Sequence, residues 1–197
     1  MMIIKTESII EILEGALNKE ISEVSISDLD TITYLRINRI SIDDVLVVDS
    51  SDLQYFHNLE ELSIENCMID DSFIENLKKT NIGKISFIHC EFVDDVKEYF
   101  EQLSINELVL NDVVGLNDLI FANIKELTFV DCSFKGIIAN VEKLDISRSE
   151  DINIDFNNSY INELVINTTQ YVDDMYLKGK IIIKDEYDVI KKVISND

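Results

Sequence analysis

Five side chains stand out in this 197-residue sequence as candidates for chemistry: Cys67, Cys90, Cys132, His57 and His89. Thiolates and imidazoles can hold a metal ion or form a nucleophile–base pair. The sequence contains no close C-x-x-C pair, and an odd number of cysteines suits a reducing compartment. A thiol nucleophile would also need an orienting third group and an oxyanion site.

The adjacent residues His89 and Cys90 give the most direct test of such a pair. Neighbouring side chains of an extended segment point to opposite sides, so His89 points outward if Cys90 points into the core. The sequence also lacks a glycine-rich phosphate loop, a nucleophile elbow and an H-E-x-x-H motif. We therefore expect no catalytic, metal or cofactor site, and predict that the protein is not an enzyme.

Pairs of aspartates recur after an apolar residue, at 43–44, 70–71, 94–95 and 173–174. Calcium loops place oxygen ligands at alternating positions and usually include a glycine for the turn. Each pair here stands alone at the start of a segment that leaves a repeat. We therefore interpret the pairs as helix caps, with the second carboxylate favoured by the helix dipole.

The chain carries a formal charge of -22, from 39 acidic and 17 basic residues. This charge argues against nucleic acid and anionic membranes as partners, because phosphate groups are bound by clustered Lys and Arg. It admits a basic protein as a partner, and it would equally keep an apolar-rich chain in solution. The start has no uninterrupted apolar signal region and no run reaches about 18 apolar residues, so a soluble, cytoplasmic protein is expected.

The segment LEELSIENCMI carries the pattern that repeats along the chain. Its core positions Leu59, Leu62, Ile64 and Cys67 are spaced by 3, 2 and 3 residues. The same spacing gives Ile32-Leu35-Ile37-Ile40, Ile82-Ile85-Phe87-Cys90, Ile105-Leu108-Leu110-Val113, Ile124-Leu127-Phe129-Cys132, Val141-Leu144-Ile146-Ser149, Ile161-Leu164-Ile166-Thr169 and a degenerate Lys178-Ile181-Ile183. An earlier copy, Ile21-Val24-Ile26-Leu29, begins only 11 residues before the next and is expected to form an edge strand or half of a hairpin.

These copies resemble the L-x-x-L-x-L-x-x-[N/C] signature of leucine-rich repeats, with Ile in place of most Leu and periods of 17–27 residues. The resemblance implies an α/β solenoid with a curved parallel sheet on the concave face and short helices or extended returns on the convex face. Alternate strand residues would point into a core that is buried by stacking of coils. The cysteines occupy the ninth position of their copies, which predicts buried thiols.

Helical spacing appears at both ends of the chain. Residues 6–18 combine a possible cap at Thr6 with an apolar stripe, and the last segment repeats such a stripe at Val189, Ile190, Val193 and Ile194. We predict a capping helix in 1–20, a solenoid over 21–186 and a second capping helix in 187–197, all in one structural domain. Shorter helices are expected after the aspartate pairs, over 73–77 and 96–103.

The outward strand residues form three columns across the predicted concave face. The first is Tyr34, Glu61, Lys84, Glu107, Glu126, Lys143, Glu163, Lys180; the second is Arg36, Ser63, Ser86, Val109, Thr128, Asp145, Val165, Ile182; the third is Asn38, Glu65, Ile88, Asn111, Val130, Ser147, Asn167, Lys184. Exposed β-branched residues there are consistent with a docking patch and equally with β-propensity on a solvated sheet.

From this face we predict a protein-binding module. The candidate binding residues are Glu61, Ser63, Glu65, Lys84, Ser86, Ile88, Glu107, Val109, Glu126, Thr128, Val130, Lys143 and Asp145. The alternative is an acidic inhibitor or immunity-type protein that blocks a basic enzyme, for example one that processes nucleic acid. Because much of the acidic excess falls on the connecting segments of the convex face, a charge-driven partner would bind there instead.

Overall fold

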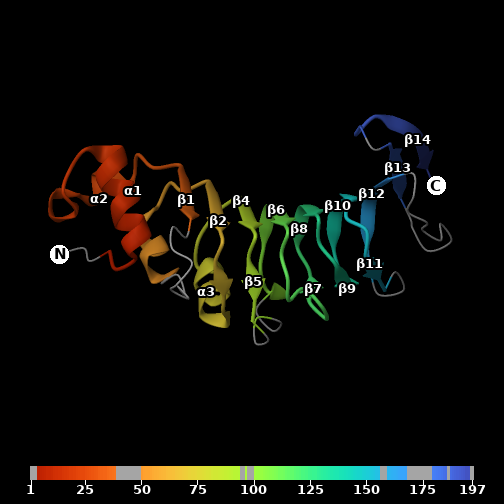
Figure 1. The fold of residues 1–197 in the computed structure, drawn as a ribbon, viewed down its shortest axis with the longest axis horizontal. Coiled ribbons are helices and arrows are strands. Elements are labelled where there is room, and N and C mark those ends of the chain that lie inside the picture. The colour runs from red at the N-terminus through yellow and green to blue at the C-terminus, as the bar shows by residue number, and fades with distance from the viewer. Residues whose placement is uncertain are drawn as a thin grey trace.

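The computed structural model describes residues 4–38, 50–93, 96, 100–155, 159–167, 179–185 and 187–195. The chain forms a parallel β-solenoid of about five turns, with the N-terminal helices at one end and strand β14 at the other (Figure 1). One face is a nine-stranded sheet in the order β1-β2-β4-β6-β8-β10-β12-β13-β14. Its strands are Tyr34–Asn38 (β1), Glu61–Glu65 (β2), Lys84–Ile88 (β4), Ile105–Asn111 (β6), Ile124–Val130 (β8), Val141–Arg148 (β10), Ile161–Asn167 (β12), Lys180–Lys184 (β13) and Ile190–Ser195 (β14).

The segments that return from one strand to the next lie on the opposite side of the solenoid (Figure 1). They include the helix α3 (Asp71–Leu77), the strand pair Met68–Ile69 (β3) with Glu91–Phe92 (β5), and the sheet of Ile120–Phe121 (β7), Phe134–Ile138 (β9) and Ile152–Ile154 (β11). The Asp70 carboxylate accepts a hydrogen bond from the Phe73 amide at 2.8 Å, which confirms the predicted cap. The other three aspartate pairs, and residues 97–99 of the helix predicted over 96–103, lie outside the described residues.

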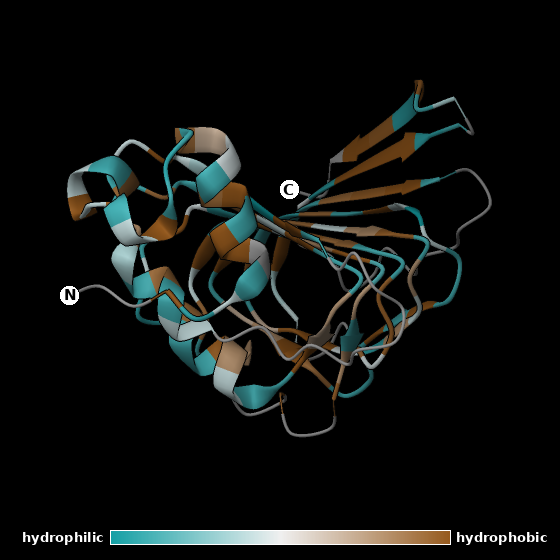
Figure 2. Ribbon diagram, turned by 60° about the vertical axis from the view of Figure 1, so that its left-hand side comes forward, coloured by the Kyte–Doolittle hydropathy of each residue, from teal (hydrophilic) through white to brown (hydrophobic). Residues whose placement is uncertain are grey.

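The core lies between the nine-stranded sheet and the returns, and hydrophobic residues occur along both layers (Figure 2). The four repeat positions Leu59, Leu62, Ile64 and Cys67 are all buried, as the spacing predicts. Each such apolar side chain contributes about 1.5–3 kcal/mol when fully buried, which offsets the ordering of its coil. A continuous row of ring contacts, with centroids 5.1–6.3 Å apart, joins Phe73, Phe87, Phe92, Phe100, Phe121, Phe129 and Phe134.

At the N-terminal end, α1 (Glu7–Leu17) forms where a helix is predicted and packs against β1 through buried Ile9 and Leu13. Thr6 occupies the cap position, but its side chain makes no capping hydrogen bond. The backbone amides of Lys5 and Thr6 instead donate to the buried carboxylate of Asp52, each at 2.8 Å. This contact joins segments 46 residues apart, so local sequence spacing gives no sign of it.

The predicted first copy, Ile21 to Leu29, is not a strand. It forms a 3₁₀ helix at Ile21–Glu23 and the short helix α2 at Ile26–Leu29. Ser25 and Asp28 make a capping box in which each side chain bonds the other residue's backbone amide. This local hydrogen bonding outweighs the apolar spacing and leaves Ile26 50% exposed.

The predicted C-terminal helix is also wrong, because β14 pairs antiparallel with β13. The turn between them is organised by Asp185, whose carboxylate accepts hydrogen bonds from the amides of Tyr187 (3.0 Å) and Val189 (2.9 Å). Lys191 also forms an ion pair with Asp185 at 2.8 Å, and this hydrogen-bonded contact lowers the pKa of the carboxyl group. The segment therefore adds an edge strand to the sheet instead of forming a helix over the last coil.

In the described parts of the chain, four coils leave the main sheet through one residue in the left-handed conformation. These residues are Asn66 (φ 55°), His89 (φ 51°), Asp112 (φ 48°) and Asp131 (φ 50°). Asn, Asp and His adopt this conformation more readily than other side chains do. Each backbone N–H still donates to a carbonyl of the next strand, with N–O distances of 2.8–2.9 Å. The chain thus turns toward the returns without losing a sheet hydrogen bond.

Candidate binding face

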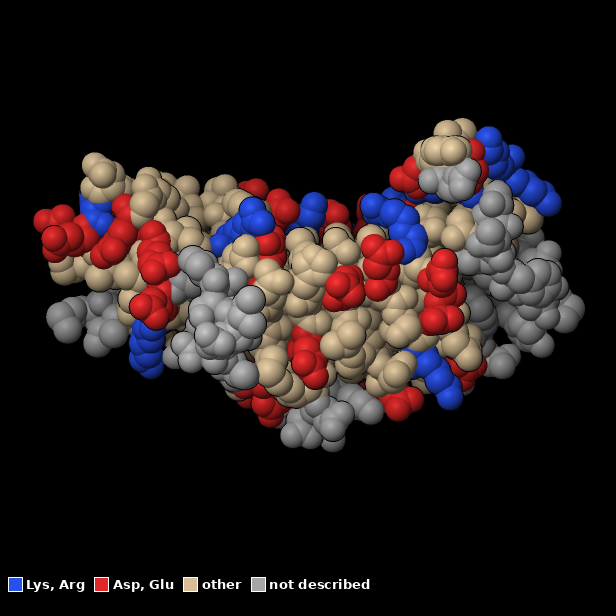
Figure 3. Space-filling view, in the orientation of Figure 1, with Lys and Arg blue, Asp and Glu red and all other residues tan. Residues whose placement is uncertain are grey.

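The outer face of the nine-stranded sheet carries the columns predicted from the sequence. The parallel register aligns Glu61, Lys84, Glu107, Glu126 and Lys143 across five successive strands. In the space-filling view the upper outline dips between the N-terminal helices and the β13–β14 hairpin, and charged side chains lie along this depression (Figure 3). All thirteen predicted binding residues therefore lie on strands β2, β4, β6, β8 and β10 of one sheet.

The first column is a ladder of cross-strand ion pairs. Lys84 lies 3.6 Å from Glu61 and 3.3 Å from Glu107, and the hydrogen bond to Glu107 raises the pKa of the Lys84 ammonium group. Lys143 pairs with Glu126 at 3.1 Å, and further along the sheet Lys180 pairs with Glu163 at 2.9 Å. Partly exposed pairs of this kind contribute little stability individually, typically below about 1 kcal/mol, but they fix how the side chains lie.

The alternation of charge in this column is broken between β6 and β8. Glu107 stands directly opposite Glu126, and each has its lysine on the far side. Directly opposed like charges on neighbouring strands are unfavourable. The middle of the face therefore presents two partly exposed carboxylates that are not separated by a cation.

Three of the predicted binding residues are mostly covered. Ser63, Glu65 and Ser86 are only 5%, 8% and 9% exposed. Arg36 donates two 2.7 Å hydrogen bonds to Glu65, from Nε to Oε1 and from Nη2 to Oε2. Ser63 donates to the same carboxylate. This two-point contact is geometrically specific, so the β1–β2 end of the face is rigid rather than open.

The centre of the face is more apolar. Ile88, Val109, Thr128 and Val130 are half-buried on adjacent strands β4, β6 and β8. The ion-pair ladder borders this group on one side. An apolar patch with a charged border is typical of protein-binding surfaces.

At the far end, Asp145 and Lys184 form an ion pair at 3.2 Å that crosses over β12. Burial alone would raise the pKa of Asp145, but hydrogen bonds from Ser147 and the charge of Lys184 hold that pKa below its usual value. Ser147 does not continue the third column as predicted. An irregularity in β10 between Asp145 and Arg148 brings Arg148 opposite Val130 instead.

Replacing Asp145 with asparagine should lower the free energy of unfolding by about 1 kcal/mol near neutral pH, because hydrogen bonds to a charged group are lost. Since folding lowers the pKa of Asp145, its contribution is present above the unfolded value of 3.8 and is lost as the pH falls through the folded value. Urea unfolding of both proteins at about pH 7, 5 and 3 checks this. The difference between the two proteins should persist at pH 5 and shrink at pH 3, and a constant difference would contradict the assignment.

The three thiols occupy the core position that the repeat predicts. The Cys90 thiol donates to the carbonyl oxygens of Ile64 and Ile88 at 3.4 and 3.3 Å, and Cys132 makes the same contacts one strand pair further on. Burial raises the pKa of both thiols, so neither is a thiolate near neutral pH. Within the described residues, no group of His, Cys, Asp and Glu is arranged to hold a metal ion.

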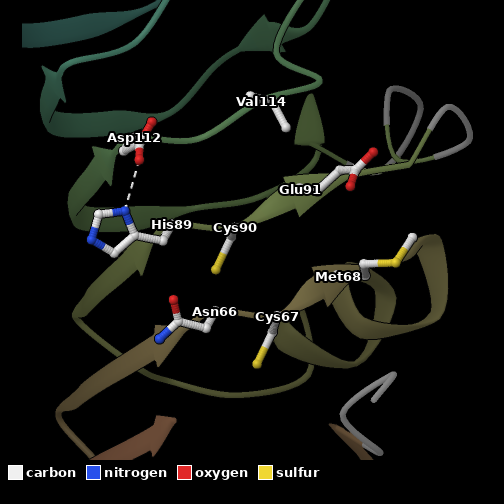
Figure 4. Close-up of a pocket in the computed structure, with 8 residues that line it drawn as sticks. All are labelled: Asn66, Cys67, Met68, His89, Cys90, Glu91, Asp112 and Val114. Carbon is white, nitrogen blue, oxygen red and sulfur yellow. Dashed lines mark hydrogen bonds and ion pairs between the residues drawn. The ribbon is translucent and has the colours of Figure 1, made fainter. Parts of the chain in front are cut away.

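An open pocket of about 370 Å³ lies beside the strand exits of β2, β4 and β6 (Figure 4). His89 and Asp112, both left-handed exit residues, form a 2.8 Å hydrogen bond at its rim, and Figure 4 shows the imidazole turned toward this carboxylate. Glu91 and Val114 complete the rim. Because the neighbouring thiols are buried and bonded to backbone carbonyls, the pocket offers an imidazole–carboxylate pair without an accessible nucleophile.

The face also includes Arg36 and Lys184, which the predicted binding set leaves out. Counting alternate residues along each strand places both of them in the predicted columns, so the sequence spacing was sufficient to identify them. No helix among the described residues is long and apolar enough to cross a membrane. Comparison with protein-family models, curated proteins and solved structures found no match for this chain.

Proposed function

We propose that this protein is a non-enzymatic protein-binding module of the leucine-rich-repeat type, which binds its partner on the outer face of the nine-stranded sheet. The observation that carries the proposal is the arrangement at the centre of that face. Half-buried Ile88, Val109 and Val130 lie beside the opposed carboxylates Glu107 and Glu126. A partner that presents apolar side chains next to a Lys or Arg would cover the patch and separate the two carboxylates.

The ninth repeat position supports the leucine-rich-repeat type. Cys90 and Cys132 donate hydrogen bonds to carbonyl oxygens of their own and the preceding strand, and Cys132 accepts one from the Val113 amide at 3.5 Å. Ser149 continues the series by accepting a hydrogen bond from the Cys132 amide at 3.2 Å. A polar or thiol side chain at this position thus links adjacent coils. The three buried thiols also suit a reducing compartment, which favours a cytoplasmic location.

The charge distribution favours a second candidate, an acidic inhibitor of a basic enzyme. The three outward columns contain six acidic and five basic residues, against 39 and 17 in the whole chain. Nearly all of the net charge of -22 therefore lies away from the outer face of the sheet. A partner attracted mainly by charge would bind the returns or the N-terminal helices, and its affinity would fall steeply with salt.

A pull-down experiment distinguishes the two candidates. The protein is immobilised and incubated with a bacterial or eukaryotic cytosolic extract, and the captured partners are identified by mass spectrometry. The variants are Val109→Lys at the centre of the face and Val114→Lys at the pocket rim, where Val114 is 57% exposed. We expect Val109→Lys to abolish capture of a partner that Val114→Lys retains. If both variants captured the partner equally well, the partner would not bind on the outer face of the sheet.

Salt supplies the second readout of the same experiment. Raising the salt concentration from about 0.1 M to about 1 M shortens the Debye length from about 10 Å to about 3 Å. Binding through the apolar centre should survive this change, whereas an inhibitor bound by carboxylates should be released. Circular dichroism and thermal unfolding of both variants control for damage to the fold.

A further inference from the structure

In the described part of the chain, a helix packs at one end of the nine-stranded sheet, and the other end is an edge strand. At the β1 end, α1 packs against the first strand through fully buried Ile9 and Leu13. At the other end β14 is the last strand, and among the described residues its only strand partner is β13. An unpaired edge strand offers a row of backbone donors and acceptors to another strand.

One row of side chains at this edge is apolar. Val165, Ile182 and Val193 stand in one row across β12, β13 and β14. The row is covered at Val165 (1% exposed) and Ile182 (7%), and it opens at Val193 (48%). Ile190 on the same strand is 56% exposed. Among the described residues, this apolar row therefore reaches the edge of the sheet at Val193 and has no further strand beside it.

The charge of this edge differs from that of the rest of the chain. Strands β13 and β14 contain Lys180, Lys184, Lys191 and Lys192 and no acidic residue, in a chain with a net charge of -22. The first three lysines are in ion pairs with Glu163, Asp145 and Asp185. Two copies of so acidic a chain repel each other over most of their surfaces. Contact through β13 and β14 would bring no carboxylates of these strands against each other.

We propose that β14 pairs antiparallel with β14 of a second copy, so that the two sheets join across a twofold axis at Val193. When a twofold axis relates two antiparallel copies of one strand, directly opposed residues point to the same face of the sheet, so they are an even number of positions apart in the sequence. The axis therefore passes between the two copies of a single residue. With Val193 on the axis, the apolar row continues through Val193 of both copies. Lys192 then faces Ile194 of the second copy.

The register with Lys192 on the axis is disfavoured by charge. The Lys192 side chains of the two copies would then face each other, and directly opposed like charges destabilise a strand pair. With Ile194 on the axis, Val193 would face Ser195 and the apolar row would be interrupted, so apolar contact favours the Val193 register. The proposed interface is separate from the outer-face binding site and does not depend on it.

Sedimentation equilibrium over a concentration series tests the proposal with the full chain. We expect a monomer–dimer equilibrium that shifts toward dimer as salt screens the charge of -22. Val193→Lys should weaken the dimer at least about tenfold, because it places two cations on the axis. Ile26→Lys is the matched control, since Ile26 is 50% exposed at the opposite end, and it should leave the equilibrium unchanged.

A cysteine variant tests the register independently. Val193→Cys puts two thiols face to face on the axis, so mild oxidation should give a covalent dimer far faster than with Val189→Cys in the turn. Equal rates would overturn the Val193 register. A chain that stays monomeric at all concentrations, or that forms open-ended polymers, would overturn the dimer itself. Unchanged circular dichroism of each variant confirms that the fold is intact.

Discussion

Replacing Phe121 with alanine is expected to lower the free energy of unfolding by about 3–5 kcal/mol, the usual cost of removing a fully buried ring. The Phe121 side chain is fully buried and contacts three rings, with centroid distances of 5.5 Å to Phe100, 5.7 Å to Phe129 and 5.4 Å to Phe134. It therefore links the return side of the core to the sheet side. Urea unfolding monitored by circular dichroism measures the loss.

The position of the damage gives a sharper test than its size. In a solenoid each coil contacts mainly its neighbours, so the cavity should destabilise the coils around Phe121 most. Hydrogen exchange of amides in β6 and β8 should accelerate more than exchange in β1. As a control, Tyr187→Ala removes a ring that is 78% exposed and should change stability by less than about 0.5 kcal/mol. Uniform acceleration along the chain would contradict this account of the core.

Replacing Gly115 with alanine is expected to destabilise the protein by about 2–4 kcal/mol. Gly115 has a φ of +83°, a conformation that alanine adopts only with strain. A Cβ atom there would also lie 2.1 Å from the carbonyl oxygen of Phe92, so the β5 segment would have to move. Thermal and urea unfolding measure the combined effect.

Gly15 provides the matched control for this prediction. It lies inside α1, and a Cβ atom there would meet nothing within 4 Å. Gly15→Ala should therefore stabilise the protein by about 0.5–1 kcal/mol, because alanine restricts the unfolded chain and favours the helix. If both substitutions changed stability by the same amount, close packing at Gly115 would not be the cause.

The parallel sheet could be predicted because its register depends on local spacing. Counting alternate residues from Leu62 and Ile64 places every residue of the first two columns, and the structure confirms these alignments. The binding of a partner to this face stays a prediction. The burial of Glu65 could not be predicted, because Glu65 is held by the long Arg36 side chain, which reaches across from the preceding strand β1.

The end segments show where local spacing fails. Val189, Ile190, Val193 and Ile194 fit a helical stripe, yet pairing with the exposed edge of β13 and the Asp185 turn make this segment a strand. The ion pair of Asp145 with Lys184 likewise joins residues 39 apart. Contacts of this kind arise only after the coils have stacked, so they leave no periodic signal in the sequence.

The left-handed exit residues have a consequence for how such a chain can change length. Asp112 and Asp131 leave the sheet in the same conformation, and the N–H of each bonds the carbonyl of the strand that follows. A cut at each of these points isolates one whole coil, 113–131, whose two ends have the same geometry. Coils could therefore be duplicated, deleted or exchanged as cassettes without a broken backbone ladder.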